Sequence, residues 1–327
     1  MKKFKVNIFL EIILIAIILA YAFFVVFQLD HEVAKVSTLN SAEQTIKNET
    51  IIKVMTYNIA HGRGHFSMYE KSAFGRNFNI KSRQEVIDRL DDIVSLVNEE
   101  KIDILILEEV DFDTTWSYNV NQATYIAKNA GFVNVVEGLK WSIDLPFFKI
   151  RSGNAILSKY PILYAKNKKY WSEGFWKRFI GGHSFLSAVY SINGKPVNVI
   201  GTHLDSDSEN NREQEAEQLV IETELSKYPV IMSGDLNAVT PLTKQENEKM
   251  RDKFGDETLE TFINSNLYDI DMDKLNPNEE RMFTYSAEDP HRLIDYIFTT
   301  KELKLTEYYV VKKELSDHFS LVARIIV

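Results

Sequence analysis

The sequence predicts an α/β fold in which two packed, mostly antiparallel β-sheets are flanked by helices, giving a four-layer α/β sandwich. Short apolar runs rich in β-branched residues recur from residue 51 to residue 327, bounded by polar or turn-forming residues. Only a few long helical patterns lie between them. Many strands with few helices favour two stacked sheets over one sheet with helices on both faces, because each apolar face must be covered by another layer.

The expected strands follow these apolar runs in chain order. They are residues 52–58, 102–107, 153–158, 185–191, 197–203, 230–234, 282–285, 293–299, 305–311 and 319–326.

Three helices are expected between the strands. The first begins after Ser82, whose hydroxyl can cap it with Glu85 three residues later, and its apolar residues fall on one face. The second covers residues 121–130 and ends at Gly131. The third, residues 209–225, is strongly charged and is expected to face solvent.

The amino-terminal segment differs from the rest. Residues 8–27 are apolar apart from Glu11, which is long enough for a membrane-spanning helix, so residues 1–28 are predicted to be a transmembrane anchor. Lysines precede the segment and acids follow it, which places the amino terminus in the cytoplasm and the remainder outside a single-pass cell-membrane protein. Cleavage near Ala20-Tyr21-Ala22, as in a signal peptide, stays open as an alternative. Residues 29–50 are predicted to be a polar tether and residues 51–327 a single domain.

Composition excludes some classes of function. The chain has 327 residues, of which 45% are hydrophobic, so it can bury a sizeable core. It has no cysteine, which excludes disulfides, thiolate metal sites and cysteine nucleophiles. The formal net charge of -9 lies entirely in residues 51–327, because acids and bases balance in residues 1–50. An acidic domain lacks the broad basic face of a non-specific DNA-binding protein.

Several of the expected strands end in acids, amides or histidines. The polar endings are Asn58, Glu108-Glu109, His203 with Asp205, Asp235 with Asn237, Asp295, and Asp317-His318. Such groups can converge at one edge of a sheet, where a metal ion and a phosphate ester could bind.

Taken in chain order, these residues resemble the endonuclease/exonuclease/phosphatase superfamily, which includes pancreatic deoxyribonuclease, AP endonucleases, inositol polyphosphate phosphatases and neutral sphingomyelinases. The resemblance covers residues 51–327 and implies a deoxyribonuclease I-like catalytic domain that hydrolyses phosphate esters with a metal ion. Two departures stand out. Glu108 lies where the family usually has glutamine, and Phe319 and Ser320 follow the Asp-His pair where a proline is common.

The resemblance also implies roles for individual residues. His318 would be the general base, oriented by Asp295, and His203 would donate to a phosphoryl oxygen. The expected metal ligands are Asn58, Glu109 and Asp317, and the expected catalytic residues are His318, His203, Asp235, Asn237 and Asp295. Mg²⁺ is the expected cofactor, with Mn²⁺ as the alternative, because hard oxygen ligands suit both. The number of ions, one or two, stays open.

Most of these residues have a structural alternative as well. Asn58 could be a turn residue, Asp235 and Asn237 an Asx-turn, Glu109 a cap, and His203 an ordinary hydrogen-bonded histidine.

Two further segments could contact a substrate. In residues 166–180 lysines alternate with aromatic residues, which suits a lipid headgroup layer or stacked bases as well as a loop packed on its own domain. The loop His61-Gly62-Arg63-Gly64 could line the substrate rim and bring Arg63 to a phosphate.

Together these observations predict a membrane-anchored, Mg²⁺-dependent phosphodiesterase that acts on nucleic acid or on a membrane phospholipid or glycolipid. A small-molecule phosphatase and a non-catalytic binding module on the same scaffold are the alternatives. No obligate protein partner is expected; the partners are the membrane and the phosphodiester substrate.

Overall fold

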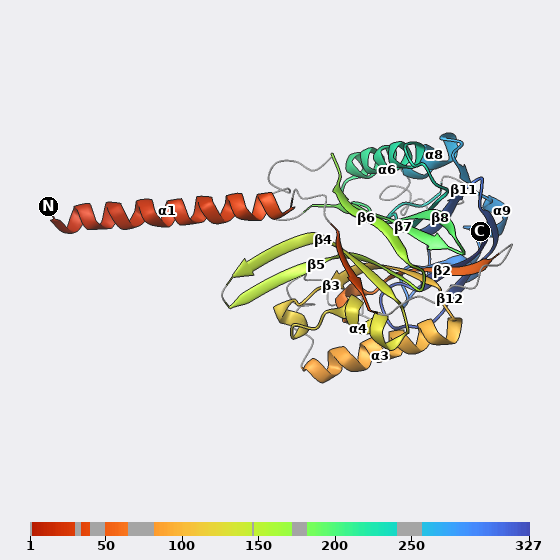
Figure 1. The fold of residues 1–327 in the computed structure, drawn as a ribbon, viewed down its shortest axis with the longest axis horizontal. Helices are drawn as coiled ribbons and strands as arrows, with labels where there is room; N and C mark the ends of the chain where they lie inside the picture. The colour runs from red at the N-terminus through yellow and green to blue at the C-terminus, as the bar shows by residue number, and fades with distance from the viewer. Residues whose placement is uncertain are drawn as a thin grey trace.

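The chain folds into two stacked β-sheets with helices on both outer faces, as the computed structural model shows (Figure 1). The structure describes residues 2–29, 34–39, 50–64, 82–145, 147–171, 182–240 and 257–327. In Figure 1 α6 and α8 cover one sheet at the top, α3 and α4 cover the other at the bottom, and α1 projects away from the body. The predicted α/β sandwich is therefore confirmed.

The larger sheet has seven strands in the order β1-β4-β5-β3-β2-β13-β12. Their bounds are β1 (Lys35–Thr38), β2 (Ile51–Asn58), β3 (Ile104–Asp111), β4 (Asn134–Leu145), β5 (Phe148–Ser158), β12 (Lys304–Val311) and β13 (Ser320–Ile326). β2 and β3 are parallel, and the other pairings in this sheet are antiparallel.

The smaller sheet has six strands in the order β10-β11-β9-β8-β7-β6. Their bounds are β6 (Ile162–Lys169), β7 (Ser184–Ile192), β8 (Lys195–His203), β9 (Val230–Asp235), β10 (Tyr268–Asp269) and β11 (Asp295–Thr300). β8 and β9 are parallel, and the remaining neighbours are antiparallel.

The helices complete the outer layers of the sandwich. Those with described side chains over most of their length are α3 (Arg83–Glu100), α4 (Gln122–Asn129), α6 (Glu209–Glu224), α8 (Thr258–Asn264) and α9 (Met272–Leu275), with short 3₁₀ turns η1 (Ala60–Gly62), η2 (Thr115–Ser117) and η4 (Glu280–Met282). One apolar core lies under α3 and α4, where Leu90 and Ile126 contact the larger sheet around Leu105. The other fills the space between the sheets and under α6 and α8.

Most of the expected strands and helices are present. Ser82 caps α3 as predicted, since its Oγ accepts a hydrogen bond from the Glu85 backbone N–H (3.1 Å). The strand expected at residues 282–285 is wrong, because this segment ends a 3₁₀ turn and Tyr285 makes only isolated bridges. Four strands, β1, β4, β6 and β10, were not expected.

The third expected helix, α6, was predicted to face solvent, and this prediction is wrong for one side of the helix. α6 buries one side against the smaller sheet, and that side includes the charged residues Arg212, Glu215 and Glu222. Their charges are paired inside the fold: both Lys166 and Lys168 contact Glu222. A charged helix can therefore lie against a sheet when the sheet supplies partners.

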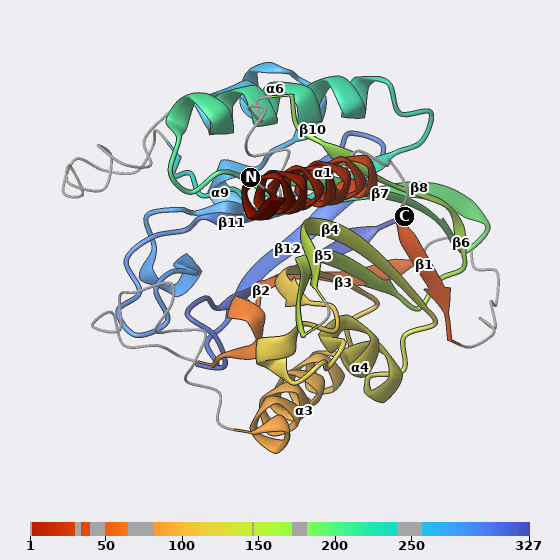
Figure 2. The same cartoon turned by 90° about the vertical axis from the view of Figure 1, so that its left-hand side faces the viewer.

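The amino-terminal segment forms the single helix α1 (Lys2–Leu29). Figure 2 looks along it, with the sandwich behind. In the part of the chain that the structure describes, no helix combines the length and the apolar character that crossing a bilayer requires, so the predicted transmembrane anchor finds no support here. The predicted tether also contains β1, which pairs with β4, so this part of it belongs to the sheet.

Polar residues replace apolar ones where several strands reach the same end of the sandwich. On the inward face of the larger sheet Val54 is followed by Thr56 and Asn58, and Ile156 is preceded by Asn154. The same change occurs in the smaller sheet, where β9 ends at Asp235 and β11 begins at Asp295. The core is therefore open at this end to a group of polar side chains.

Candidate active site

A cleft of about 310 Å³ opens at the polar end of the two sheets. Residues from both sheets and from the loops between them form its wall: Asn58, Glu109, Lys140, His203, Ser206, Asp207, Asp235, Asn237, Tyr285, Arg292, Ile294, Asp317 and His318. All the predicted site residues except Asp295 line it. Asp295 lies directly behind His318.

His318 is held between two carboxylates. Its Nδ1 lies 2.9 Å from Oδ2 of Asp295, and its Nε2 lies 3.5 Å from Oδ2 of Asp235. Burial alone would lower the pKa of His318, but Asp295 and Asp235 together raise it well above its usual value. The imidazole therefore has a high affinity for a proton, and Asp295 fixes which nitrogen faces the cleft.

Asp235 is tied to two neighbours at the end of β9. Oδ2 of Asp235 accepts from Nδ2 of Asn58 (3.1 Å), and Oδ1 accepts from the backbone N–H of Asn237 (3.0 Å). Burial raises the pKa of Asp235 to about 7, reinforced by Asp295 and opposed by His318 and these hydrogen bonds. The bond from Asn237 is the Asx-turn that the sequence left open, so the turn and a place in the cleft coexist.

A β-bulge presents Glu109 to the cleft. Between Leu107 and Val110 two residues of β3, Glu108 and Glu109, lie opposite the single residue Asn154 of β5, and Glu109 has a left-handed backbone with φ 52°. Its side chain is 35% exposed. Burial on its own would raise the pKa of Glu109, but His61, His203 and Lys140 outweigh burial and lower this pKa to about 2. Glu109 is therefore an ionised carboxylate at any physiological pH.

The same bulge turns Glu108 inward. Glu108 is fully buried, and its Oε1 accepts a hydrogen bond from Oγ1 of Thr56 (2.8 Å). Burial raises the pKa of Glu108 well above its usual value, and Asp295 acts in the same direction. A carboxyl group held toward its protonated form can both donate and accept, which is compatible with the glutamine usual at this position in the family.

His203 lies at the end of β8, between Glu109 and Asp235. Its Nε2 is 3.7 Å from Oδ2 of Asp235, and its ring stacks on that of His183 with centroids 6.3 Å apart. Burial lowers the pKa of His203 to about 3, with Lys140 acting in the same direction. His203 is therefore a neutral imidazole that can donate one hydrogen bond into the cleft.

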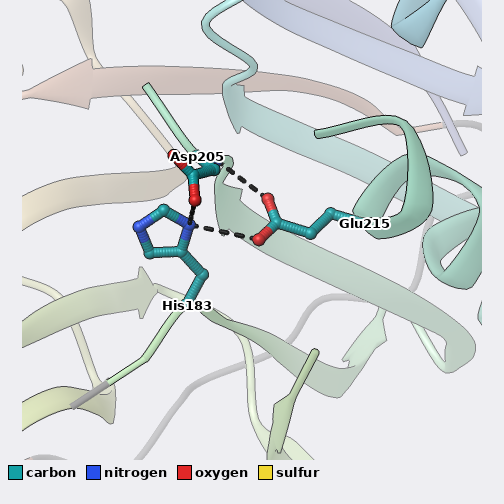
Figure 3. A group of neighbouring side chains, drawn as sticks. All are labelled: His183, Asp205 and Glu215. Atoms are coloured by element: carbon teal, nitrogen blue, oxygen red, sulfur yellow. Dashed lines mark hydrogen bonds and ion pairs between the residues drawn. The ribbon is translucent and has the colours of Figure 1, made fainter. Parts of the chain in front are cut away.

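A hydrogen-bonded cluster lies behind His203. Figure 3 shows Asp205 and Glu215 around the ring of His183, with Nδ1 of His183 3.1 Å from Oε1 of Glu215 and 4.0 Å from Oδ2 of Asp205. Glu215 also accepts from the backbone N–H of Asp205 (2.8 Å), and Asp205 accepts from the backbone N–H groups of Asp207 and Ser208. These bonds satisfy the carboxylates and fix the loop whose residues Ser206 and Asp207 line the cleft.

The oxygen ligands predicted for a cation lie in this one cleft. Glu109 and Asp317 contribute carboxylates to it and Asn58 contributes an amide. The amide is partly engaged, because Oδ1 of Asn58 accepts from the backbone N–H of Ala60 (3.1 Å) and its Nδ2 donates to Asp235. Two carboxylates and an amide facing one polar cleft fit a hard divalent ion such as Mg²⁺.

The cleft residues that were not predicted from the sequence include Lys140, Tyr285 and Arg292. The guanidinium carbon of Arg292 lies 4.3 Å from the centroid of the Tyr285 ring, and that ring lies 4.8 Å from the ring of His318. The only sequence signal for Arg292 was its position, three residues before Asp295. Lys140 lies within the unpredicted strand β4, so no motif marked it.

A smaller lobe of about 150 Å³ adjoins the cleft and shares Glu109, Lys140 and His203 with it. Its other lining residues are His61, Trp141, Ser152, Gly153 and Asn154. The His61-Gly62-Arg63-Gly64 loop therefore does reach the site, but through His61 and not through Arg63, which lines neither lobe.

The lysine- and aromatic-rich segment 166–180 is described only as far as Trp171, and the rest lies outside the described residues. In the described part Tyr170 is fully buried and hydrogen-bonded to Thr202, and Lys166 and Lys168 pair with Glu222. This part contacts its own domain.

Comparisons with known proteins agree with the fold. A sequence model of the endonuclease/exonuclease/phosphatase family matches residues 55–318. No curated protein sequence matches the chain significantly. The structure resembles an endonuclease/exonuclease/phosphatase from Beutenbergia cavernae with a TM-score of 0.58 at 20% identity, over 84% of this chain and 71% of that one.

Two other solved structures are similar over nearly their whole length. One is a mannosyl-6-phosphatase from Bacteroides thetaiotaomicron, with a TM-score of 0.57 at 14% identity over 84% of this chain and 99% of that one. The other is the catalytic domain of human Nocturnin with a bound sulfate anion. Its TM-score is 0.58 at 18% identity, over 89% of this chain and 96% of that one. At these identities the likeness establishes the fold alone.

Proposed function

Because the chain belongs to the endonuclease/exonuclease/phosphatase family, whose members are phosphoester hydrolases, we propose that it hydrolyses a phosphodiester by cation- and histidine-assisted attack of water. The observation that carries this proposal is that Glu109 and His318, far apart in the sequence, line one cleft. A non-catalytic module would have no need for an ionised carboxylate and a proton-binding imidazole in the same cleft.

The cation would be Mg²⁺ or Mn²⁺, held by Glu109 and Asp317 with help from Asn58. When bound, such an ion neutralises negative charge on the phosphate and lowers the pKa of a coordinated water. His318, once its ring is deprotonated, would serve as the base that removes a proton from water through Nε2, because Nδ1 is engaged by Asp295. Asp235, 3.5 Å from the same Nε2, lies where it can orient the attacking water.

Hydrogen-bond donors line the cleft in which a phosphate would bind. Neutral His203 can donate without adding charge, and Lys140 and Arg292 bring positive charge to the cleft wall. Charge that develops on phosphoryl oxygens in the transition state is stabilised best by donors already in place.

Of the substrates considered, a lipid headgroup phosphodiester is favoured by the hairpin of β4 and β5. Its exposed apolar side chains are Trp141, Leu145, Phe147 and Phe148, and Phe147 is 96% exposed. In Figure 1 this hairpin extends toward the same side as α1, and Tyr21 of α1 accepts a hydrogen bond from the Asp144 backbone N–H (3.2 Å). An exposed apolar hairpin whose Trp141 lines the smaller lobe suits a lipid surface, and the net charge of -9 disfavours nucleic acid.

We also propose that α1 associates the enzyme with the outer side of the cell membrane. The support is the apolar sequence of residues 8–27 and the exposure of Leu10, Ile12, Ile17 and Leu19, each more than half exposed. Fractionation of the full chain, compared with a version that begins at residue 34, tests this location. Recovery of both proteins in the same fraction would argue against it.

The function is tested by a hydrolysis panel with Mg²⁺ or Mn²⁺. The substrates are phosphatidylinositol and sphingomyelin vesicles, plasmid DNA and small phosphate monoesters, and the proteins are the wild type and His318→Ala. Lipid turnover that is lost in the variant is the expected result. Cleavage of DNA alone would replace the lipid substrate with nucleic acid, turnover of monoesters alone would favour the phosphatase, and no turnover with no cation binding would favour the binding module.

A further inference from the structure

His61 forms a second carboxylate-imidazole pair, next to Glu109. Nδ1 of His61 lies 2.8 Å from Oδ1 of Asp111, and Asp111 is fully buried. The other oxygen of Asp111 accepts from Nε1 of Trp116 (2.9 Å), and its backbone N–H donates to Gln122 (2.9 Å). Asp111 is thus fixed from three sides, and it fixes the ring of His61.

This pairing decides which nitrogen of His61 is free to bind a ligand. A carboxylate can only accept, so the proton lies on Nδ1, and Nε2 of the neutral ring keeps its lone pair. Nε2 lies 3.5 Å from Oε2 of Glu109, and both side chains line the smaller lobe. A lone pair facing a carboxylate is repulsive unless a proton on Nε2 or a cation lies between the two atoms.

The backbone at both residues is strained in a way that brings them together. His61 has φ 57° and Glu109 has φ 52°, both in the left-handed region that non-glycine residues avoid. The carbonyl of His61 accepts from Nε2 of Gln122 (2.6 Å), and the backbone N–H of Ile59 donates to the carbonyl of Glu108 (3.1 Å). Strain that is held in place by neighbouring hydrogen bonds is concentrated at functional sites.

We propose that Nε2 of His61 coordinates the divalent cation together with the carboxylate of Glu109. Donors about 2.1 Å from an octahedral ion lie about 3 Å from each other, so a separation of 3.5 Å between Nε2 and Oε2 needs little adjustment. The Asp111 contact is the partner that metal-bound histidines commonly have on their other ring nitrogen. The inference rests on the proposed function, because it assigns a further ligand to the cation of the same site.

A nitrogen ligand changes which ion the site prefers. Mg²⁺ favours oxygen ligands, whereas Mn²⁺, Co²⁺ and Zn²⁺ accept imidazole more readily. With His61 as a ligand, we expect the cleft to bind Mn²⁺, Co²⁺ or Zn²⁺ more tightly than Mg²⁺.

The test is Mn²⁺ binding to the full chain, with no substrate present. Mn²⁺ affinity is measured from the electron paramagnetic resonance signal of the free ion, and pulsed measurements report coupling of bound Mn²⁺ to an imidazole nitrogen. For His61→Ala we expect at least a 10-fold loss of Mn²⁺ affinity, a smaller loss of Mg²⁺ affinity measured by competition, and loss of the nitrogen coupling. His291→Ala is the matched control, because His291 lines neither lobe, and it should behave as the wild type.

The possible outcomes separate the alternatives. If His61 only pairs with Glu109 and competes with the cation for this carboxylate, His61→Ala would keep or increase the Mn²⁺ affinity. That result would overturn the inference. Nitrogen coupling that persists in His61→Ala would assign the ligand to His203 or His318 and would also overturn it. A wild-type protein that binds no divalent ion would overturn both this inference and the cation-dependent mechanism, whereas Mn²⁺ binding unaffected by His61→Ala would leave that mechanism standing.

Discussion

Two carboxylate-imidazole pairs flank the cleft, and they differ in how the chain builds them. Asp295 and His318 come from β11 and from the segment just before β13, and Nδ1 of His318 is 2.9 Å from its carboxylate. Asp111 and His61 come from the end of β3 and from η1, at almost the same separation of 2.8 Å. In each pair Nε2 faces another carboxylate at 3.5 Å, which is Asp235 for His318 and Glu109 for His61.

The two pairs differ in the pKa of the second carboxylate, which is Asp235 beside His318 and Glu109 beside His61. Burial raises the pKa of Asp235 to about 7, so a proton can be shared between Asp235 and His318. The pKa of Glu109 is lowered to about 2, so Glu109 keeps its charge and attracts a cation. If the proposals hold, the same side-chain arrangement would serve proton transfer at His318 and cation binding at Glu109.

Removal of the proton-transfer pair should have the largest effect. His318→Ala is expected to lower kcat/KM about 10²- to 10⁴-fold, the range typical of a missing general base. Cation affinity should change much less than in Glu109→Gln, because His318 is placed in proton transfer. Steady-state kinetics on the substrate found in the panel and Mn²⁺ titration of the same preparation measure both quantities. Equal losses of rate and cation affinity would contradict the division of labour between the two pairs.

Glu109→Gln changes the other side of the cleft. The amide keeps the shape of the side chain but loses the charge, so we expect cation affinity to fall by more than about 100-fold, the upper figure for loss of an outer partner of a metal ligand. Activity should return in part at high cation concentration, which separates this variant from His318→Ala. Cation dependence of turnover and thermal unfolding, to show an intact fold, are the measurements. Unchanged cation dependence would remove Glu109 from the set of ligands.

The proton-transfer pair should also make stability depend on pH. Folding raises the pKa of both His318 and Asp235, so the cation-free folded protein binds these protons more tightly than the unfolded chain does. The stabilisation from His318 is fully present below about pH 6.5, the pKa of histidine in the unfolded chain, and is lost as the pH rises through the folded pKa of His318. The stabilisation from Asp235 is fully present only below about pH 4, and it is lost as the pH rises through the folded pKa of about 7.

Denaturant unfolding from pH 6 to pH 9 is the measurement. The free energy of unfolding of the cation-free protein should fall with rising pH, by up to about 1.4 kcal/mol per pH unit for each proton. Asp295→Asn should flatten the fall, because it removes the main group that raises the pKa of His318. An equal slope in wild type and variant would show that His318 does not hold the extra proton.

The two pairs also show what a sequence can reveal. The sheets were predictable because β2, β7, β8, β9, β11 and β13 are short runs rich in apolar and β-branched residues. The polar residues at the ends of these runs pointed to Asn58, His203, Asp235, Asp295 and His318. Strand β4 was not predicted, because it contains Gly138 and charged residues, and Lys140 was therefore not predicted either. His61 could not be assigned, because its position depends on left-handed backbone at η1 and on Asp111 fifty residues later. Pairs formed by regular strands are visible in a sequence, whereas pairs formed by strained turns need the structure.

The smallest expected effect concerns the support of the His61 pair. Trp116→Phe keeps an aromatic ring against Phe148 but removes the hydrogen bond from Nε1 to Oδ2 of Asp111. Asp111 is buried and loses one donor, so the free energy of unfolding should fall by about 1.5–3 kcal/mol, the usual worth of a hydrogen bond to a charged group. Mn²⁺ affinity should fall less than in His61→Ala, because Asp111 still accepts from the ring.

Trp171→Phe is the matched control for this variant, because Trp171 is 59% exposed and its substitution should leave both quantities unchanged. Urea unfolding and Mn²⁺ titration of the two variants measure the effect. If Trp116→Phe were as stable as the control and bound Mn²⁺ as the wild type does, Asp111 would be held by its remaining contacts alone. The His61 pair would then resemble the His318 pair in not depending on a further hydrogen bond to its carboxylate. In the His318 pair, Oδ1 of Asp295 has no hydrogen-bond partner among the described residues.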